Sequence, residues 1–232
     1  MTSVFIDLWG FCCLGRPHKA AEREAPLLAT TDFPPTEKLW EGGDFIYLGS
    51  GIYYKKILFI NVKVYAVALY VEASVARREL RRLQDEGFFK GRGYTDDSLT
   101  AALNAGKFRK CLQIQMLRSA TVSQFDSEIS KDLRPRLEKT GDQGLLQPFL
   151  DYFKDKSFTT GTTLLSLWEE DNVLTGDLFP PGFNDFADAK VSQALPSENF
   201  CRALYDMYIG PSSIVPDGRS QFAQGALELL KS

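Results

Sequence analysis

The chain has 232 residues, of which 44% are hydrophobic and 25% are charged, and its formal net charge is −3. This is the composition of an ordinary globular protein that is long enough to bury a sizeable core. The slight negative charge argues against nucleic acid as a partner, and no apolar run approaches the ~18 residues that a transmembrane segment needs.

In chain order, residues 1–40 are expected to form an N-terminal extension, and residues 41–232 are expected to form one domain. The extension begins with a short apolar patch over residues 4–14, and Pro34-Pro35 interrupts regular structure near its end. Three interpretations of the patch stay open. It packs on its own domain, it docks the chain in a protein complex, or it carries an acyl group on Cys12 and Cys13.

The next segment predicts strands, because it is rich in β-branched and aromatic residues. We expect strands over residues 44–49, 52–60 and 62–71, and the last two could also form one long bent strand. Gly49-Ser50-Gly51 is expected to form a corner between the first two strands.

The rest of the chain mixes helices with further strands. A capping-box pattern at residues 121–124 predicts a helix start. Phe125 and Ile129 lie four residues apart on its apolar face, whereas Asp126 and Glu128 are expected on its solvent face. The other helices are expected over 73–86, 96–106, 145–153, 197–209 and 217–230, and the other strands over 110–117, 162–168 and 173–178. Without strict alternation of strand and helix, this order favours the α+β class.

Cysteine and histidine are scarce and poorly placed for metal chemistry. The cysteines are Cys12, Cys13, Cys111 and Cys201, which follow no zinc spacing, and the single histidine is His18. We therefore expect no metal site, no cofactor and no histidine-based catalytic triad. Cys111 and Cys201 are expected to be small core residues.

Three segments, in the correct order, resemble the chalcone isomerase family. Residues 61–72 are similar to the signature strand of the family. Residues 110–137 follow its order of strand, Thr-Val-Ser-Gln-Phe and amphipathic helix, and residues 205–216 are similar to its helix, Ile-Gly turn and start of the last helix. The resemblance covers about residues 45–230. It implies an open-faced β-sandwich, in which a large antiparallel sheet is backed by helices and the ligand cleft lies between them.

The resemblance also implies that the catalytic residues of the family are replaced. In the plant enzymes that close chalcones into flavanones, an arginine after the Gly-rich corner helps to attract the phenolate, and this chain has Tyr53 there. The threonine, the tyrosine, the asparagine and the Ser/Thr of the family correspond to Tyr65, Phe125, Asp132 and Met207. Because the loss of one such donor typically costs roughly 10²–10³-fold in rate, we assign no catalytic residue and favour a protein without enzymatic activity.

Other members of the family bind fatty acids in the same cleft, where an arginine and a tyrosine hold the carboxylate. Tyr65 matches that tyrosine, but the arginine is missing. Arg118 is one candidate for the cation. Lys55 and Lys63 are two others, because they share strand parity with Tyr53 and Tyr65 if no bulge intervenes. The expected ligand-binding residues are therefore Tyr53, Lys55, Lys63, Tyr65, Arg118, Phe125 and Met207.

These observations leave three hypotheses. The leading one is a non-catalytic protein that holds a fatty acid or a similar amphiphile in the cleft. The second is an accessory subunit that uses the fold as a scaffold and the N-terminal segment for docking. The third is an isomerase with an altered residue set. Members of the family act in plastids or mitochondria, so the resemblance implies an organelle.

Overall fold

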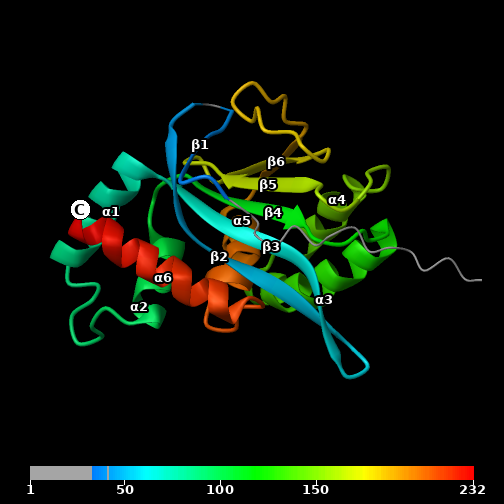
Figure 1. Cartoon of the computed structure of the whole chain (residues 1–232). Coiled ribbons are helices and arrows are strands. Elements are labelled where there is room, and N and C mark those ends of the chain that lie inside the picture. The colour runs from blue at the N-terminus through cyan, green and yellow to red at the C-terminus, as the bar shows by residue number, and fades with distance from the viewer. Residues whose placement is uncertain (1–32, 41) are drawn as a thin grey trace, which may run out of the picture.

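The computed structural model describes residues 33–40 and 42–232 (Figure 1). The predicted N-terminal patch, Cys12, Cys13 and His18 lie outside the described residues. Within the described part of the chain, seven strands form an antiparallel sheet in sequential order. The strands are β1 (Thr36–Lys38), β2 (Asp44–Ile57), β3 (Ile60–Glu72), β4 (Lys110–Met116), β5 (Thr163–Trp168), β6 (Val173–Phe179) and β7 (Gln193–Pro196).

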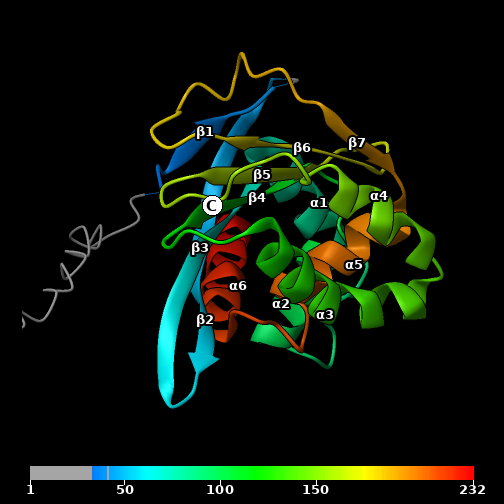
Figure 2. The same cartoon turned by 90° about the vertical axis from the view of Figure 1, so that its right-hand side faces the viewer.

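The helices gather on one side of this sheet (Figure 2). They are α1 (Ala73–Asp85), α2 (Asp96–Ala105), α3 (Val122–Thr140), α4 (Leu146–Asp151) after the short 3₁₀ turn η1 (Gln143–Leu145), α5 (Glu198–Ile209) and α6 (Pro216–Lys231). The main core lies between sheet and helices and includes the predicted core residue Cys201. The α+β class and the large antiparallel sheet backed by helices are thus confirmed.

A second, smaller apolar cluster lies on the opposite face of the sheet. Trp40, Phe45 and Tyr70 pack there with Phe179 and the other predicted core cysteine, Cys111. Residues that follow β1 and residues between β6 and β7 contribute to this cluster, so the second face is also covered in part.

Strand β1 lies N-terminal to the expected domain boundary at residue 41. It pairs with β2 through Glu37 and Phe45, and the following residues Leu39 and Trp40 are buried. The indole of Trp40 also donates a hydrogen bond to the Thr175 hydroxyl at 3.1 Å. The folded sheet therefore includes residues that sequence analysis placed in the extension.

The predicted corner at Gly49-Ser50-Gly51 lies inside β2, so the prediction of two separate strands is wrong. The glycines instead let helix α6 approach the strand closely. A Cβ atom on Gly51 would lie 2.6 Å from the Cα of Gly218, and one on Gly225 would lie 2.1 Å from the carbonyl oxygen of Leu48. Because glycine has no side chain, α6 can pack directly against the backbone of the first part of β2.

Strands β2 and β3 turn at Leu58-Phe59, so the strand expected over residues 52–60 ends at Ile57. The resulting hairpin extends well beyond the rest of the fold (Figure 1). None of the helices in the described ranges is both long and apolar enough to cross a membrane.

The predicted helix starts depend on local capping. The capping box of α3 forms as predicted, because Thr121 and Gln124 exchange hydrogen bonds between side chain and backbone. Helix α2 is capped by Thr95 with Ser98, one residue before the predicted start at residue 96.

Candidate functional site

A cavity of about 150 Å³ lies between the sheet and helices α3 and α5. Strands β2, β3 and β4 supply one wall. Much of the lining is apolar and includes Ile57, Val62, Val64, Ile114, Met116 and Leu164. An apolar concavity that holds a few polar groups is the usual form of a small-molecule site.

The structure brings most of the predicted ligand-binding residues together in this cavity. Its lining includes Tyr53, Lys55, Tyr65, Arg118, Phe125 and Met207. Lys63 is the exception, because it is exposed and does not line the cavity.

A bulge explains the position of Lys63. Tyr53 pairs with Tyr65, but the next residue, Tyr54, pairs with Lys63, so β3 has an extra residue at Val64. The shift changes the parity of the strand. Val62 and Val64 then face the cavity, and the parity argument for Lys63 does not hold.

Two tyrosine hydroxyls meet inside the cavity. The Tyr65 and Tyr208 hydroxyl oxygens are 3.5 Å apart, and the ring of Tyr65 stacks on that of Tyr53 with 4.8 Å between ring centroids. Burial raises the pKa of Tyr65 and of Tyr208, so both phenols stay protonated at neutral pH. A pair of hydroxyls uses one hydrogen between its members, and the other hydrogen can be donated to a ligand.

Glu128 of α3 also lines the cavity, which corrects the prediction that it lies on the solvent face of its helix. Its carboxylate accepts a hydrogen bond from the Tyr53 hydroxyl at 3.0 Å and forms an ion pair with Lys55. Burial alone would raise the pKa of Glu128. The hydrogen bonds from Lys55 and Tyr53 outweigh that effect, so the pKa lies below its usual value.

The sequence contained a signal for this position of Glu128. Glu128 follows Phe125 by three residues and precedes Asp132 by four, and all three belong to one stripe of the helix. Phe125 was correctly expected on the apolar face, where it stacks on Phe158 with 4.3 Å between ring centroids. The stripe that faces the sheet therefore carries acidic residues as well as apolar ones.

The charged side chains of the lining balance one another. Lys55 and Arg118 are basic, whereas Glu128 and Asp132 are acidic. Arg118 follows β4, has an exposed side chain and donates its backbone N–H to the carbonyl of Val64 at 3.2 Å. The cavity therefore offers donors and cations to a ligand, but no net positive charge.

Position 53 supplies the cavity with a neutral hydroxyl rather than a cation. Tyr53 is where the family's arginine was expected, and burial followed by the bond to Glu128 raises its pKa, so it stays neutral. Within residues 33–40 and 42–232, no group of three or more His, Cys, Asp or Glu residues is placed to hold a metal ion.

Comparison with known proteins agrees with this fold. No family model matches the chain. Chalcone–flavanone isomerase 1 of Fragaria ananassa is 25% identical over 212 residues, which cover 86% of this chain and 84% of the relative. A crystal structure of a fatty-acid binding protein from Arabidopsis thaliana superposes with a TM-score of 0.69 at 20% identity, and the match covers 86% of this chain and 95% of that one.

These likenesses define the molecule as a protein of the chalcone-isomerase fold. The chain is a homologue of chalcone isomerase, so the resemblance stated from its sequence motifs is confirmed.

Proposed function

We propose that the protein binds a fatty acid or a similar single-chain amphiphile in the cavity and performs no chemistry on it. One observation carries the proposal: an apolar cavity in which the hydroxyls of Tyr65 and Tyr208 meet beside the Lys55–Glu128 ion pair. Apolar walls suit an acyl chain, and the polar groups suit a head group. The fatty-acid binding name of the Arabidopsis protein with the same fold supports the proposal.

We expect the head group of the ligand to lie next to the hydroxyls of Tyr65 and Tyr208. A buried carboxylate without partners is very costly, so an acid ligand requires donors. Tyr65 or Tyr208 supplies a neutral donor, and Lys55 or Arg118 supplies a cation. Because Glu128 already pairs with Lys55, a ligand carboxylate either shares Lys55 or shares a proton with Glu128.

The absence of isomerase chemistry follows from the groups around Tyr53. Cyclisation of a chalcone develops negative charge that a preorganised donor or cation must stabilise. Tyr53 carries no positive charge and donates its hydroxyl to Glu128. Glu128 also adds negative charge beside the place where a phenolate would bind, which opposes the reaction.

Native mass spectrometry of the purified full chain tests this function. We expect a retained single-chain lipid whose mass can be released and identified. Val64→Trp should remove it, because the larger side chain fills the cavity. Lys63→Trp is the matched control, since it introduces the same side chain one residue away and outside the lining. A lipid retained equally by both variants, or none in the wild type, would contradict the proposal.

The same measurement addresses the alternative functions. A protein partner that remains bound in place of a lipid would favour the accessory-subunit hypothesis. That hypothesis, and location in a plastid or mitochondrion, stay predictions from the family resemblance.

A further inference from the structure

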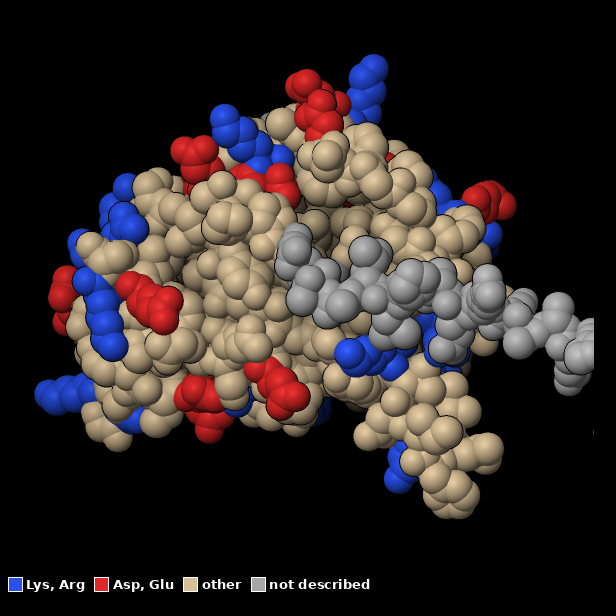
Figure 3. Space-filling view, in the orientation of Figure 1, with Lys and Arg blue, Asp and Glu red and all other residues tan. Residues whose placement is uncertain are grey.

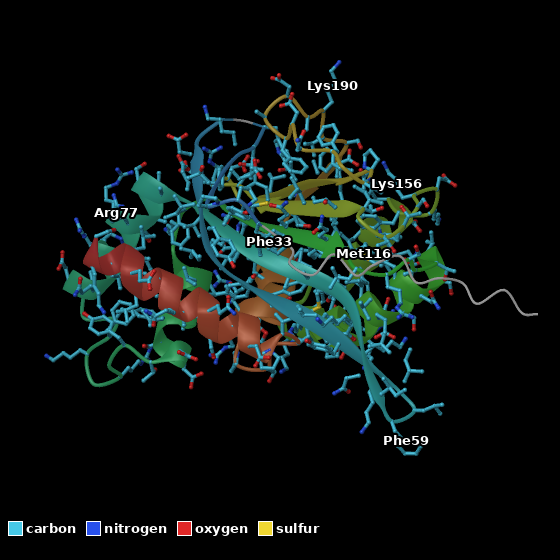
Figure 4. All side chains as sticks on the ribbon, in the orientation of Figure 1. Phe33, Phe59, Arg77, Met116, Lys156 and Lys190 are labelled. Atoms are coloured by element: carbon cyan, nitrogen blue, oxygen red, sulfur yellow. The ribbon has the colours of Figure 1, made fainter. Side chains whose placement is uncertain are left out.

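The β2–β3 hairpin ends in four consecutive apolar residues, all of which are exposed. We define the hairpin tip as residues 57–60. Leu58 is 84% exposed and Phe59 is 94% exposed, and their neighbours Ile57 and Ile60 are 48% and 69% exposed. Phe59 lies at the far end of the hairpin, away from the body of the protein that holds Met116 (Figure 4). A cluster of large apolar side chains on a protruding turn indicates an interaction surface.

Basic residues lie directly behind the hairpin tip. Lys56 and Lys63 are both exposed, and the sequence has no acidic residue between Asp44 and Glu72. The space-filling view shows the tip as a tan knob with blue basic atoms and no red acidic atoms on it (Figure 3). Tyr54, which is also exposed, pairs with Lys63 across the hairpin.

An apolar end followed by lysines and a tyrosine matches the layers of a membrane surface. Apolar side chains enter the acyl boundary, aromatic hydroxyls lie at the head-group level, and lysines attract anionic lipids. We propose that the hairpin tip docks the protein on a bilayer that contains anionic lipids. Leu58 and Phe59 enter the bilayer boundary, and Lys56 and Lys63 contact the phosphate groups.

A protein partner fits this surface less well. A stable protein interface buries about 800 Å² on each partner, whereas one aromatic side chain buries roughly 150–250 Å². A tip of four residues on a narrow two-stranded ribbon therefore provides too little area. A bilayer needs no complementary pocket, so a small convex apolar knob suffices.

The hairpin also joins this surface to the cavity. Ile57 at the edge of the tip and Val62 beyond it both belong to the cavity lining. Docking through the tip therefore brings the cavity close to the bilayer, which is a source of amphiphiles. The docking itself does not require an occupied cavity, so it goes beyond the proposed function and can be tested apart from it.

Vesicle flotation of the full chain tests the docking. Phosphatidylcholine vesicles with phosphatidylglycerol should carry the wild type, and pure phosphatidylcholine vesicles should carry less. The double variant Leu58→Asn/Phe59→Ser should lower partitioning at least about tenfold. Asparagine suits position 58, because Leu58 has a φ of +55°. Tyr94→Ser is the control, since it removes an exposed aromatic ring outside the hairpin.

Three other variants separate the contributions of charge, apolar insertion and ligand binding. Lys56→Gln/Lys63→Gln should remove the preference for phosphatidylglycerol, and with it most of the salt dependence. Phe59→Trp should show a blue-shifted emission with these vesicles, which reports entry of position 59 into an apolar layer. Val64→Trp should float like the wild type, so loss of ligand binding and loss of docking can be distinguished.

The proposal is overturned if the wild type does not float with phosphatidylglycerol vesicles. It is equally overturned if Leu58→Asn/Phe59→Ser floats as well as the wild type, because another segment then carries the binding. Self-association that this double variant abolishes, without any vesicle binding by the wild type, would assign the hairpin tip to a second copy of the chain instead.

Discussion

Lys55 of β2 and Glu128 of α3 form an ion pair in the wall of the cavity, and Tyr53 donates a hydrogen bond to the same carboxylate. One of the candidate cations for a ligand carboxylate, Lys55, thus already has an internal acidic partner. Because the two carboxylates would repel each other, Glu128 is expected to disfavour ionised head groups relative to neutral ones.

Glu128→Gln should therefore raise the affinity for dodecanoate. The change frees Lys55 and removes a negative charge, and the gain should be about threefold to tenfold because the pair is partly exposed. Dodecanol should bind with little change. Calorimetric titration with dodecanoate and with dodecanol measures the ratio of the two affinities. Asp126→Asn is the matched control, since it removes a carboxylate from the same helix outside the lining. An unchanged preference in Glu128→Gln would show that Glu128 does not select the head group.

Chalcone cyclisation should be absent in the wild type. Tyr53 is neutral and donates its hydroxyl to Glu128, so position 53 supplies no cation for the phenolate, and Lys55 is already paired with Glu128. The loss of chalcone absorbance at neutral pH, compared with the spontaneous reaction, measures this. A rate more than about a hundredfold above that background would contradict the expectation, because one oxyanion donor supplies roughly that factor.

Two N-terminal truncations should show which residues before Gly42 contribute to the stability of the fold. A chain that begins at Asp32 keeps β1 and should melt close to the full chain. A chain that begins at Gly42 loses β1 together with the buried side chains of Leu39 and Trp40. It should be less stable by roughly 3 kcal/mol or more. Denaturant unfolding measures both. Equal loss in the two truncations would mean that residues before Asp32 belong to the core, and no loss in either would show that β1 contributes little.

Lys110 should make stability depend on pH. Its ammonium group is buried and donates to the Leu103 and Gly106 carbonyls at 2.7 and 2.9 Å, and burial lowers its pKa to about 7. The pKa of a lysine in the unfolded chain is about 10.4. Between these values only the unfolded chain binds the proton, so stability rises with pH, by up to about 1.4 kcal/mol per unit.

Comparison with Lys110→Met isolates this effect. The free energy of unfolding of the wild type, minus that of the variant, should grow as the pH rises from about 7 to about 9. Denaturant unfolding over that pH range gives the difference. A difference that stays constant would show that Lys110 titrates alike in the folded and unfolded chains.

Local patterns predicted the parts of the fold that depend on local chemistry. The capping box at Thr121 forms as predicted, and strands β5 and β6 lie within one residue of their predicted bounds. The short strands β1 and β7 were not predicted, because three or four residues such as Gln193–Pro196 carry little periodicity. Such edge strands are fixed by their partner strands.

The unpredicted parts of the site depend on contacts between distant segments. The bulge at Val64 has no local sequence signal, yet it turns Lys63 away from the cavity. Glu128 shares a helical stripe with Phe125, but its partners Tyr53 and Lys55 lie on β2, and only the packing of α3 against β2 brings them together. The glycines of β2 likewise suggested a corner because their partner, α6, lies far along the chain.

Calorimetric titration of the full chain with dodecanoic acid tests the central claim most directly, with Tyr65→Phe as the diagnostic variant. The wild type should bind, and Tyr65→Phe should weaken binding by roughly 0.5–3 kcal/mol, the range for a lost hydrogen bond. The fold should survive, because the change opens no large cavity. Binding that Tyr65→Phe leaves unaffected would place the head group elsewhere, and no binding by the wild type to either dodecanoic acid or dodecanol would contradict the ligand-binding function itself.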